Sequence, residues 1–154
     1  MGAKQTAANE FANGLLRLVF QNDATNAATT ALGSGLLASG TAGSLYVSLH
    51  TSSPTATGNQ SSFEATYPSY QRVAIARSTS AWTVTANSVS PNATIVFPTS
   101  TGSPSETETY FGIGTASTGN GHLCYFGSIS PTITVNASGI SPEIVGVGSI
   151  ISEN

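Results

Sequence analysis

Few residues of this chain could do acid–base or metal chemistry. Its histidines are His50 and His122, and it has a single cysteine, Cys124. His122 and Cys124 are two residues apart, so on a strand they would point to the same face and form half of a metal site. No further ligand lies at a workable spacing, and we interpret them as an incidental pair on a hairpin. Because Cys124 is flanked by apolar residues, it is predicted to be a small core side chain.

Two carboxylates, Glu106 and Glu108, also stand two residues apart. Such a pair can flank a glycosidic bond, or bind Ca²⁺ together with loop carbonyls. The interpretation we favour is the solvated face of a strand. The sequence contains no Gly-x-Ser-x-Gly elbow, Walker loop, His-Glu-x-x-His or Cys-x-x-Cys motif. It therefore predicts a protein that is not an enzyme and that holds no cofactor or metal.

The composition argues against two classes of partner. Only 7% of the 154 residues are charged, with four Lys and Arg against seven Asp and Glu. Four cations cannot form the basic stripe that binds nucleic acid. The apolar runs at residues 15–20 and 144–151 are too short or too interrupted to span a bilayer. Residues 1–6 match the N-myristoylation motif, but this short pattern often matches by chance. A polar, nearly uncharged surface suits a protein held among other proteins.

The arginines are expected to be paired, because the chain has so few charges. Arg72 and Arg77 lie five residues apart, which places them on opposite faces of a strand. One is predicted to hold a carboxylate such as Glu64 within the subunit, and the other to do so across an interface. Plain surface exposure is the alternative for both.

One helix is predicted, over residues 6–20, with a stop at Asn22-Asp23. Its apolar residues recur at the i, i+4, i+7 and i+8 spacing of one helix face. These residues are Phe11, Leu15, Leu18 and Val19. The face either packs on the sheet of its own subunit or docks on a neighbouring subunit as an arm. A short second helix is expected around residues 27–32.

Short strand patterns fill the rest of the chain. Leu45, Val47 and Leu49 alternate with polar residues, as in a half-buried strand. The predicted strands cover residues 45–49, 71–77, 81–85, 87–90, 94–97, 107–114, 122–128, 129–135 and 140–151. Gly112 and Gly114 indicate a bulge or a close backbone approach, and Asn120-Gly121 indicates a tight turn.

This pattern predicts a mainly β fold, an antiparallel β-sandwich or barrel of jelly-roll type with one N-terminal α-helix. Residues 1–43 would form a helical arm and linker, and residues 44–154 the β domain of a single compact molecule. The connection over residues 51–66 is longer than usual and is therefore a candidate contact.

Several segments resemble a family of small structural proteins of tailed-bacteriophage virions, labelled as decoration or tail-fibre-like proteins. The similar segments are residues 11–20, 43–54, 58–60, 67–77, 82–84, 95–98 and 110–121. Ser53-Pro54 stands where the family usually has Asp-Pro, and Phe63-Glu64 where it often has Asn-Glu. The resemblance implies a virion protein without catalytic residues.

The expected function is a capsid decoration or cement protein on the capsid exterior, made in the bacterial cytoplasm. It would bind the lattice of major capsid protein, as a dimer or trimer of itself, and stabilise the head by mass action. The expected contacts are Phe11, Leu15, Leu18, Val19, Arg72, Arg77 and the loop over residues 51–66. A fibre usually has a repeat-rich shaft, which this chain lacks, so a tail or tail-fibre-associated protein is the alternative. A carbohydrate-binding module with Tyr46, Tyr67, Tyr70 and Trp82 as stacking platforms is the second alternative.

Overall fold

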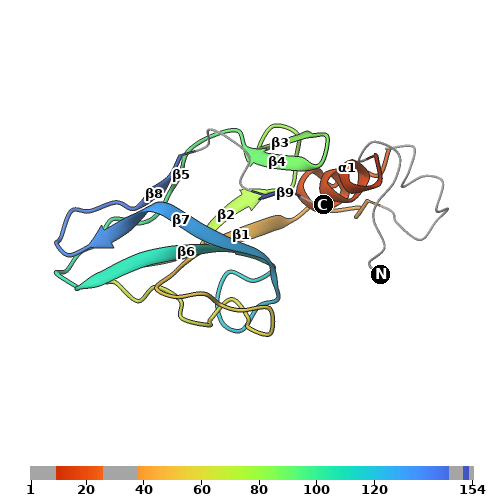
Figure 1. Ribbon diagram of the computed structural model, residues 1–154. Coiled ribbons are helices and arrows are strands. Elements are labelled where there is room, and N and C mark those ends of the chain that lie inside the picture. Colours follow the sequence, from red (N-terminus) through yellow and green to blue (C-terminus); the bar gives the residue numbers. More distant parts are fainter. Residues whose placement is uncertain (1–9, 26–37, 146–150, 153–154) are drawn as a thin grey trace. The chain divides into compact units, whose positions relative to one another are not determined.

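A computed structural model describes residues 10–25, 38–145 and 151–152 (Figure 1). The fold is mainly antiparallel β with one N-terminal helix, as the sequence predicts. The predicted helix at residues 27–32, the helix start at residues 6–9 and the pattern at residues 1–6 lie outside the described residues. Within the described part of the chain the sheets are open rather than closed into a barrel.

The chain divides into two compact units. The helix unit comprises residues 1–43, 76–93 and 146–154, and the sheet unit comprises residues 44–75 and 94–145. The division expected from the sequence, an arm over residues 1–43 and a β domain over residues 44–154, stays a prediction.

The sheet unit contains a four-stranded antiparallel sheet in the order β2-β1-β6-β7. Its strands are β1 (Ser44–His50), β2 (Val73–Ala76), β6 (Glu106–Gly114) and β7 (Leu123–Val135), and a separate pair joins β5 (Ile95–Val96) to β8 (Glu143–Ile144). The two strands predicted over residues 122–135 are one strand. The pairing of β7 with β6 is irregular after Glu108, because Glu108 pairs with Ile133 but Tyr110 pairs with Ser128. Residues 129–132 of β7 therefore lie opposite the single residue Thr109 of β6.

Both faces of β1 are covered. Leu45, Val47 and Leu49 are buried, as their alternation predicts, but Ser48 and His50 on the opposite face are each 0% exposed. Gly112 of β6 provides the room for them, because a Cβ there would lie 2.6 Å from Nε2 of His50 and 2.7 Å from Oγ of Ser48. The close approach predicted at this glycine is therefore confirmed.

The helix unit contains α1 (Glu10–Leu16), which continues as a turn of π-helix, η1 (Arg17–Gln21). Asn22 ends it in the left-handed conformation, at the predicted stop. Its sheet has the order β3-β4-β9, with β3 (Trp82–Thr85), β4 (Ser88–Pro91) and β9 (Ile151–Ser152). No helix among the described residues is long and apolar enough to cross a membrane.

The helix buries a different stripe from the one expected. Ala12, Leu16 and Phe20 are 0% exposed, and the Phe20 ring packs edge-on against Trp82 at 4.9 Å between centroids. Phe11, Leu15, Leu18 and Val19 are only half-buried. The spacing rule selected the wrong stripe for the core because Ala12 is small and because η1 turns more widely than an α-helix.

Candidate functional site

The segment over residues 51–66, here called the covering loop, is tied to the end of β1. Thr51 N donates to Phe63 O at 2.9 Å, and Ala65 N donates to Leu49 O at 2.9 Å. His50 and Glu64 form an isolated antiparallel bridge between these two bonds. Residues 63–65 therefore run beside β1 as an additional short stretch of strand pairing.

His50, the last residue of β1, holds the covering loop against the sheet. Its Nδ1 lies 2.8 Å from Ser62 O and its Nε2 lies 2.8 Å from Ser48 Oγ. Because a carbonyl only accepts, Nδ1 carries the proton and Nε2 accepts from the Ser48 hydroxyl. Burial lowers the pKa of His50, against the opposing effect of the Ser62 hydrogen bond, so the ring is neutral at pH 7.

The Ser48–His50 pair has the hydrogen bond of a hydrolase nucleophile and its base, but not the access. Both side chains are 0% exposed. A substrate carbonyl cannot reach the Ser48 hydroxyl without displacing the covering loop. The hydrogen bonds of His50 to Ser48 and Ser62 therefore have a structural role, which is to join the covering loop to the sheet.

Arg72 also holds the covering loop in place, through an ion pair with Glu64. Its Nε donates to Glu64 Oε1 at 2.6 Å and its Nη2 to Glu64 Oε2 at 2.7 Å, which is the bidentate geometry of a strong ion pair. Nη1 and Nη2 also donate to Ala116 O and Gly119 O, at 2.9 and 2.7 Å. The Arg72–Glu64 pair suggested by the sequence is thus present within the chain, and the Arg72 side chain is 3% exposed.

The buried guanidinium also orders the connection between β6 and β7. Gly119, whose carbonyl it binds, has a φ of 71° and supplies left-handed backbone in the segment where the sequence predicted a tight turn. Gln60 of the covering loop, which is 0% exposed, accepts from Ala116 N at 2.9 Å and donates its own N–H to Gly121 O at 3.1 Å. The covering loop and the β6–β7 connection therefore brace each other.

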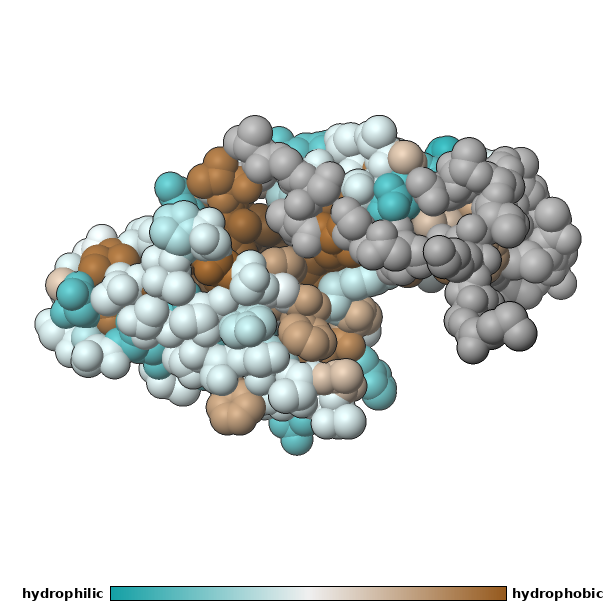
Figure 2. Space-filling model, in the orientation of Figure 1, coloured by the Kyte–Doolittle hydropathy of each residue, from teal (hydrophilic) through white to brown (hydrophobic). Residues whose placement is uncertain are grey.

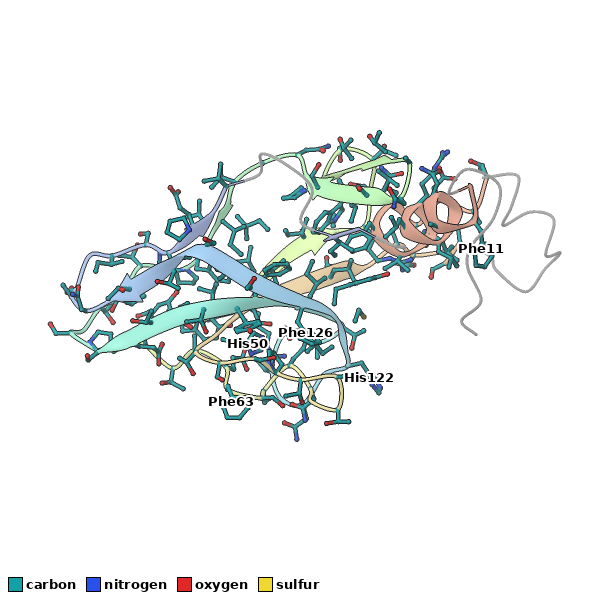
Figure 3. The ribbon with its side chains drawn as sticks, in the orientation of Figure 1. Phe11, His50, Phe63, His122 and Phe126 are labelled. Carbon is teal, nitrogen blue, oxygen red and sulfur yellow. The ribbon has the colours of Figure 1, made fainter. Side chains whose placement is uncertain are left out.

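Phe63 is the side chain that this bracing presents to solvent. It is 58% exposed, the largest value among the described large apolar residues, and its φ is 55°. Figure 3 shows Phe63 on the outer side of the loop, with His50 between the loop and the sheet. A bulky residue in the left-handed region costs about 1–2 kcal/mol, which the flanking bonds of Ser62 and Glu64 offset.

The surface of the sheet unit around Phe63 carries hydroxyl and amide groups. Figure 2 shows much of this unit as pale, with a larger brown area beside β5 and β8. Thr51, Ser61, Thr118 and Asn120 are exposed. Glu64 and Arg72, the nearest charges in the sequence, neutralise each other. Phe126, which is 39% exposed, lies on the sheet face of Ser48 through the register Ser48–Gly112–Phe126.

Arg77 closes the end of the helix instead of reaching a carboxylate. Its guanidinium donates to Val19 O and Leu18 O, each at 2.6 Å, and to Ala42 O at 3.0 Å. These carbonyls lie in the last turn of η1 and in the segment before β1, where a cation is favourable. A contact of Arg77, Phe11, Leu15, Leu18 or Val19 with a partner stays a prediction; Phe11 is labelled in Figure 3.

Glu106 and Glu108 do not form the solvated strand face expected from the sequence. Glu106 accepts from Thr66 N, Thr66 Oγ1 and Tyr67 N, at 2.8–3.1 Å, and Glu108 is 0% exposed. Burial, and to a smaller extent the neighbouring Glu106, raise the pKa of Glu108 to about 8, so at pH 7 it is mainly the neutral acid. With Glu106 saturated and Glu108 enclosed, the pair cannot flank a glycosidic bond or bind Ca²⁺.

The remaining candidates are placed as follows. His122 and Cys124 are exposed, so Cys124 is not the core residue that its apolar neighbours suggested. Among the described residues no three His, Cys, Asp or Glu side chains form a group that could hold a metal ion. Trp82 and Tyr67 are 0% and 2% exposed, so neither ring can stack on a sugar.

Comparison with known proteins places the chain in a family. A family model described as "Podophage GP4 fiber I protein gp80" matches residues 6–146. No curated protein matches the sequence. The match covers both compact units and most of the chain, and the resemblance to virion structural proteins is thereby confirmed. This chain belongs to the Gp80 family of podophage fibre proteins, which are structural components of the virion.

Proposed function

We propose that this chain is a structural subunit of the tail-fibre apparatus and that it acts through binding to other tail proteins. The observation that carries the proposal is the match of residues 6–146 to a fibre protein family. This favours the tail-fibre alternative of the sequence analysis over decoration of the capsid. The missing repeat-rich shaft fits a short fibre component or an attachment piece better than a long rod.

The chemistry of the described residues supports a binding role. The Ser48–His50 and Glu106–Glu108 pairs, which resemble catalytic groups, are enclosed or saturated by internal hydrogen bonds. The ion pairs Arg17–Asp23 and Arg72–Glu64 are internal as well. Contacts with a partner would therefore rest on apolar and neutral polar groups, as in the centre of protein–protein interfaces.

Antibody labelling of intact virions tests the location. Antibodies raised against the purified chain, viewed by electron microscopy, are expected to decorate the tail or its fibres. Particles from a phage that lacks the gene serve as the control for non-specific labelling. Uniform label over the head would overturn the proposal and return the chain to the capsid surface.

A further inference from the structure

The covering loop holds its aromatic residue in an unfavourable position. Phe63 combines a left-handed backbone, with a φ of 55°, and 58% exposure. Gly and Asn adopt this conformation most readily, and a phenyl ring that is 58% exposed gains little burial within the subunit to offset the strain. An outlier of this kind persists where the surrounding structure fixes it, and such positions cluster at functional sites.

The flanking residues fix Phe63 on both sides. Ser62 O is bound by buried His50, and Glu64 by Arg72 and by Tyr70 Oη at 3.0 Å. Phe63 O itself accepts from Thr51 N and from Thr51 Oγ1, at 2.9 and 3.3 Å. The ring is therefore presented on a pre-organised backbone, which reduces the entropy lost on binding.

We propose that Phe63 is the anchor by which the chain docks into an apolar recess on another protein of the virion. This inference rests on the proposed function, because a fibre subunit must be joined to other proteins of the particle. Buried aromatic side chains surrounded by neutral polar groups are the usual energetic centres of such interfaces. The neutral Ser, Thr and Asn side chains around Phe63 provide that surround.

Other occupants fit the surface less well. A nucleic acid or an anionic lipid surface would need cations, and the Arg72 guanidinium beside Phe63 is 3% exposed. A glycan would be held by planar polar groups next to the aromatic ring, and the two charged ones nearest in the sequence, Glu64 and Arg72, are engaged with each other. A second copy would have to offer an apolar recess, whereas the pocket next to Glu64 has the charged side chains of Glu64 and Arg72 in its lining.

Complementation of a phage that lacks the gene tests the anchor. The full chain is supplied as wild type, Phe63→Gly, Phe63→Leu or Val96→Thr, and its copies per purified particle are measured by quantitative mass spectrometry. Phe63→Gly should fold normally, because Gly accepts a positive φ without strain, yet its copy number should fall about tenfold or more. Phe63→Leu should retain most of the binding.

Val96→Thr is the matched control, because Val96 is 53% exposed on β5 but lies outside the covering loop. This variant should assemble into particles as the wild type does. Phe63→Asn provides a second variant that tolerates the left-handed conformation, and the urea midpoint of each free chain shows that it is folded. Wild-type copy numbers for folded Phe63→Gly and Phe63→Asn would overturn the anchor. So would a dimer of the free wild-type chain that Phe63→Gly abolishes, since the occupant would then be a second copy. Absence of the wild-type chain from particles would instead refute the proposed function.

Discussion

At the scale of single residues, Arg72 and Arg77 among the described residues bind other parts of their own chain. Arg72 joins the covering loop to the β6–β7 connection through one carboxylate and two carbonyls. The sequence could suggest Glu64 as its partner, because few other charges are available. It could not reveal the carbonyls of Ala116 and Gly119, because they are more than forty positions away and backbone acceptors have no sequence signature.

Loss of the Arg72 guanidinium should destabilise the fold strongly. Arg72→Ala leaves Glu64, whose side chain is 17% exposed, without its counter-ion, and the expected loss is about 3 kcal/mol in the free energy of unfolding. Arg17→Ala is the control, because Arg17 is 34% exposed and its pair with Asp23 should contribute at most about 1 kcal/mol. Urea denaturation measures both. Equal losses for the two variants would contradict the role assigned to Arg72.

Glu108 should make the protein less stable at alkaline pH. The folded state holds the Glu108 proton up to a pKa of about 8, whereas the unfolded chain releases it near the ordinary glutamate pKa of 4.5. Folding therefore binds a proton between these values, and the free energy of unfolding should fall by roughly 1 kcal/mol from pH 7 to 8. His50 acts in the opposite direction, because burial lowers its pKa, but most of its effect lies below pH 7, since the unfolded imidazole has an ordinary pKa of 6.5.

Glu108→Gln tests this assignment, because the amide keeps the size of the side chain and does not ionise. Urea titrations at pH 7, 8 and 9 should show a flatter pH dependence than in the wild type. An unchanged slope would mean that another group is responsible. The sequence alone predicted a solvated carboxylate here, because burial at the end of β6 depends on the register shift after Glu108.

At the scale of the elements, the strands were the most predictable part. The alternation of Leu45, Val47 and Leu49 identified β1 and its core face correctly. The burial of Ser48 and His50 on the other face was not predictable, because it depends on the covering loop. Phe63 was not singled out either, since nothing in the residue type indicates a positive φ.

Gly112 should be the most sensitive glycine of the sheet. Gly112→Ala places a Cβ within 2.7 Å of Leu123 Cδ1 and still closer to His50, so it should cost about 1–3 kcal/mol of stability through overpacking. Gly40→Ala is the control, because a Cβ there has no neighbour within 4 Å, and its effect should stay within about 0.5 kcal/mol. Thermal unfolding of both variants would decide, and a tolerated Gly112→Ala would argue against the close contact with His50.

Two neighbouring leucines of α1 distinguish a role in core packing from a role in binding a partner. Leu16 is 0% exposed and Leu15 is half-buried. Leu16→Ala should therefore cost about 2–5 kcal/mol of stability, and Leu15→Ala less than half of that. If Leu15 belongs to a partner contact, its alanine variant should instead lower incorporation into particles. A larger stability loss for Leu15→Ala would restore the core face expected from the sequence.

At the scale of the whole molecule, the sparse charge and the fibre family point to the same kind of protein. Only 7% of the residues are charged and the described ion pairs are internal, a composition that suits a protein held among other proteins. The sequence suggested a virion protein correctly, through its resemblance to small phage structural proteins. It favoured the head over the tail because the chain lacks a repeat-rich shaft, whereas the family match supports a fibre role.

The number of copies per virion tests the central claim most directly. Quantitative mass spectrometry of purified particles, with the major capsid protein as the internal standard, gives this number without knowledge of the binding site. A fibre subunit should be present in a few to a few dozen copies, as the symmetry of a tail requires. Hundreds of copies, in a fixed ratio to the capsid protein, would contradict the assignment and identify a protein of the capsid lattice.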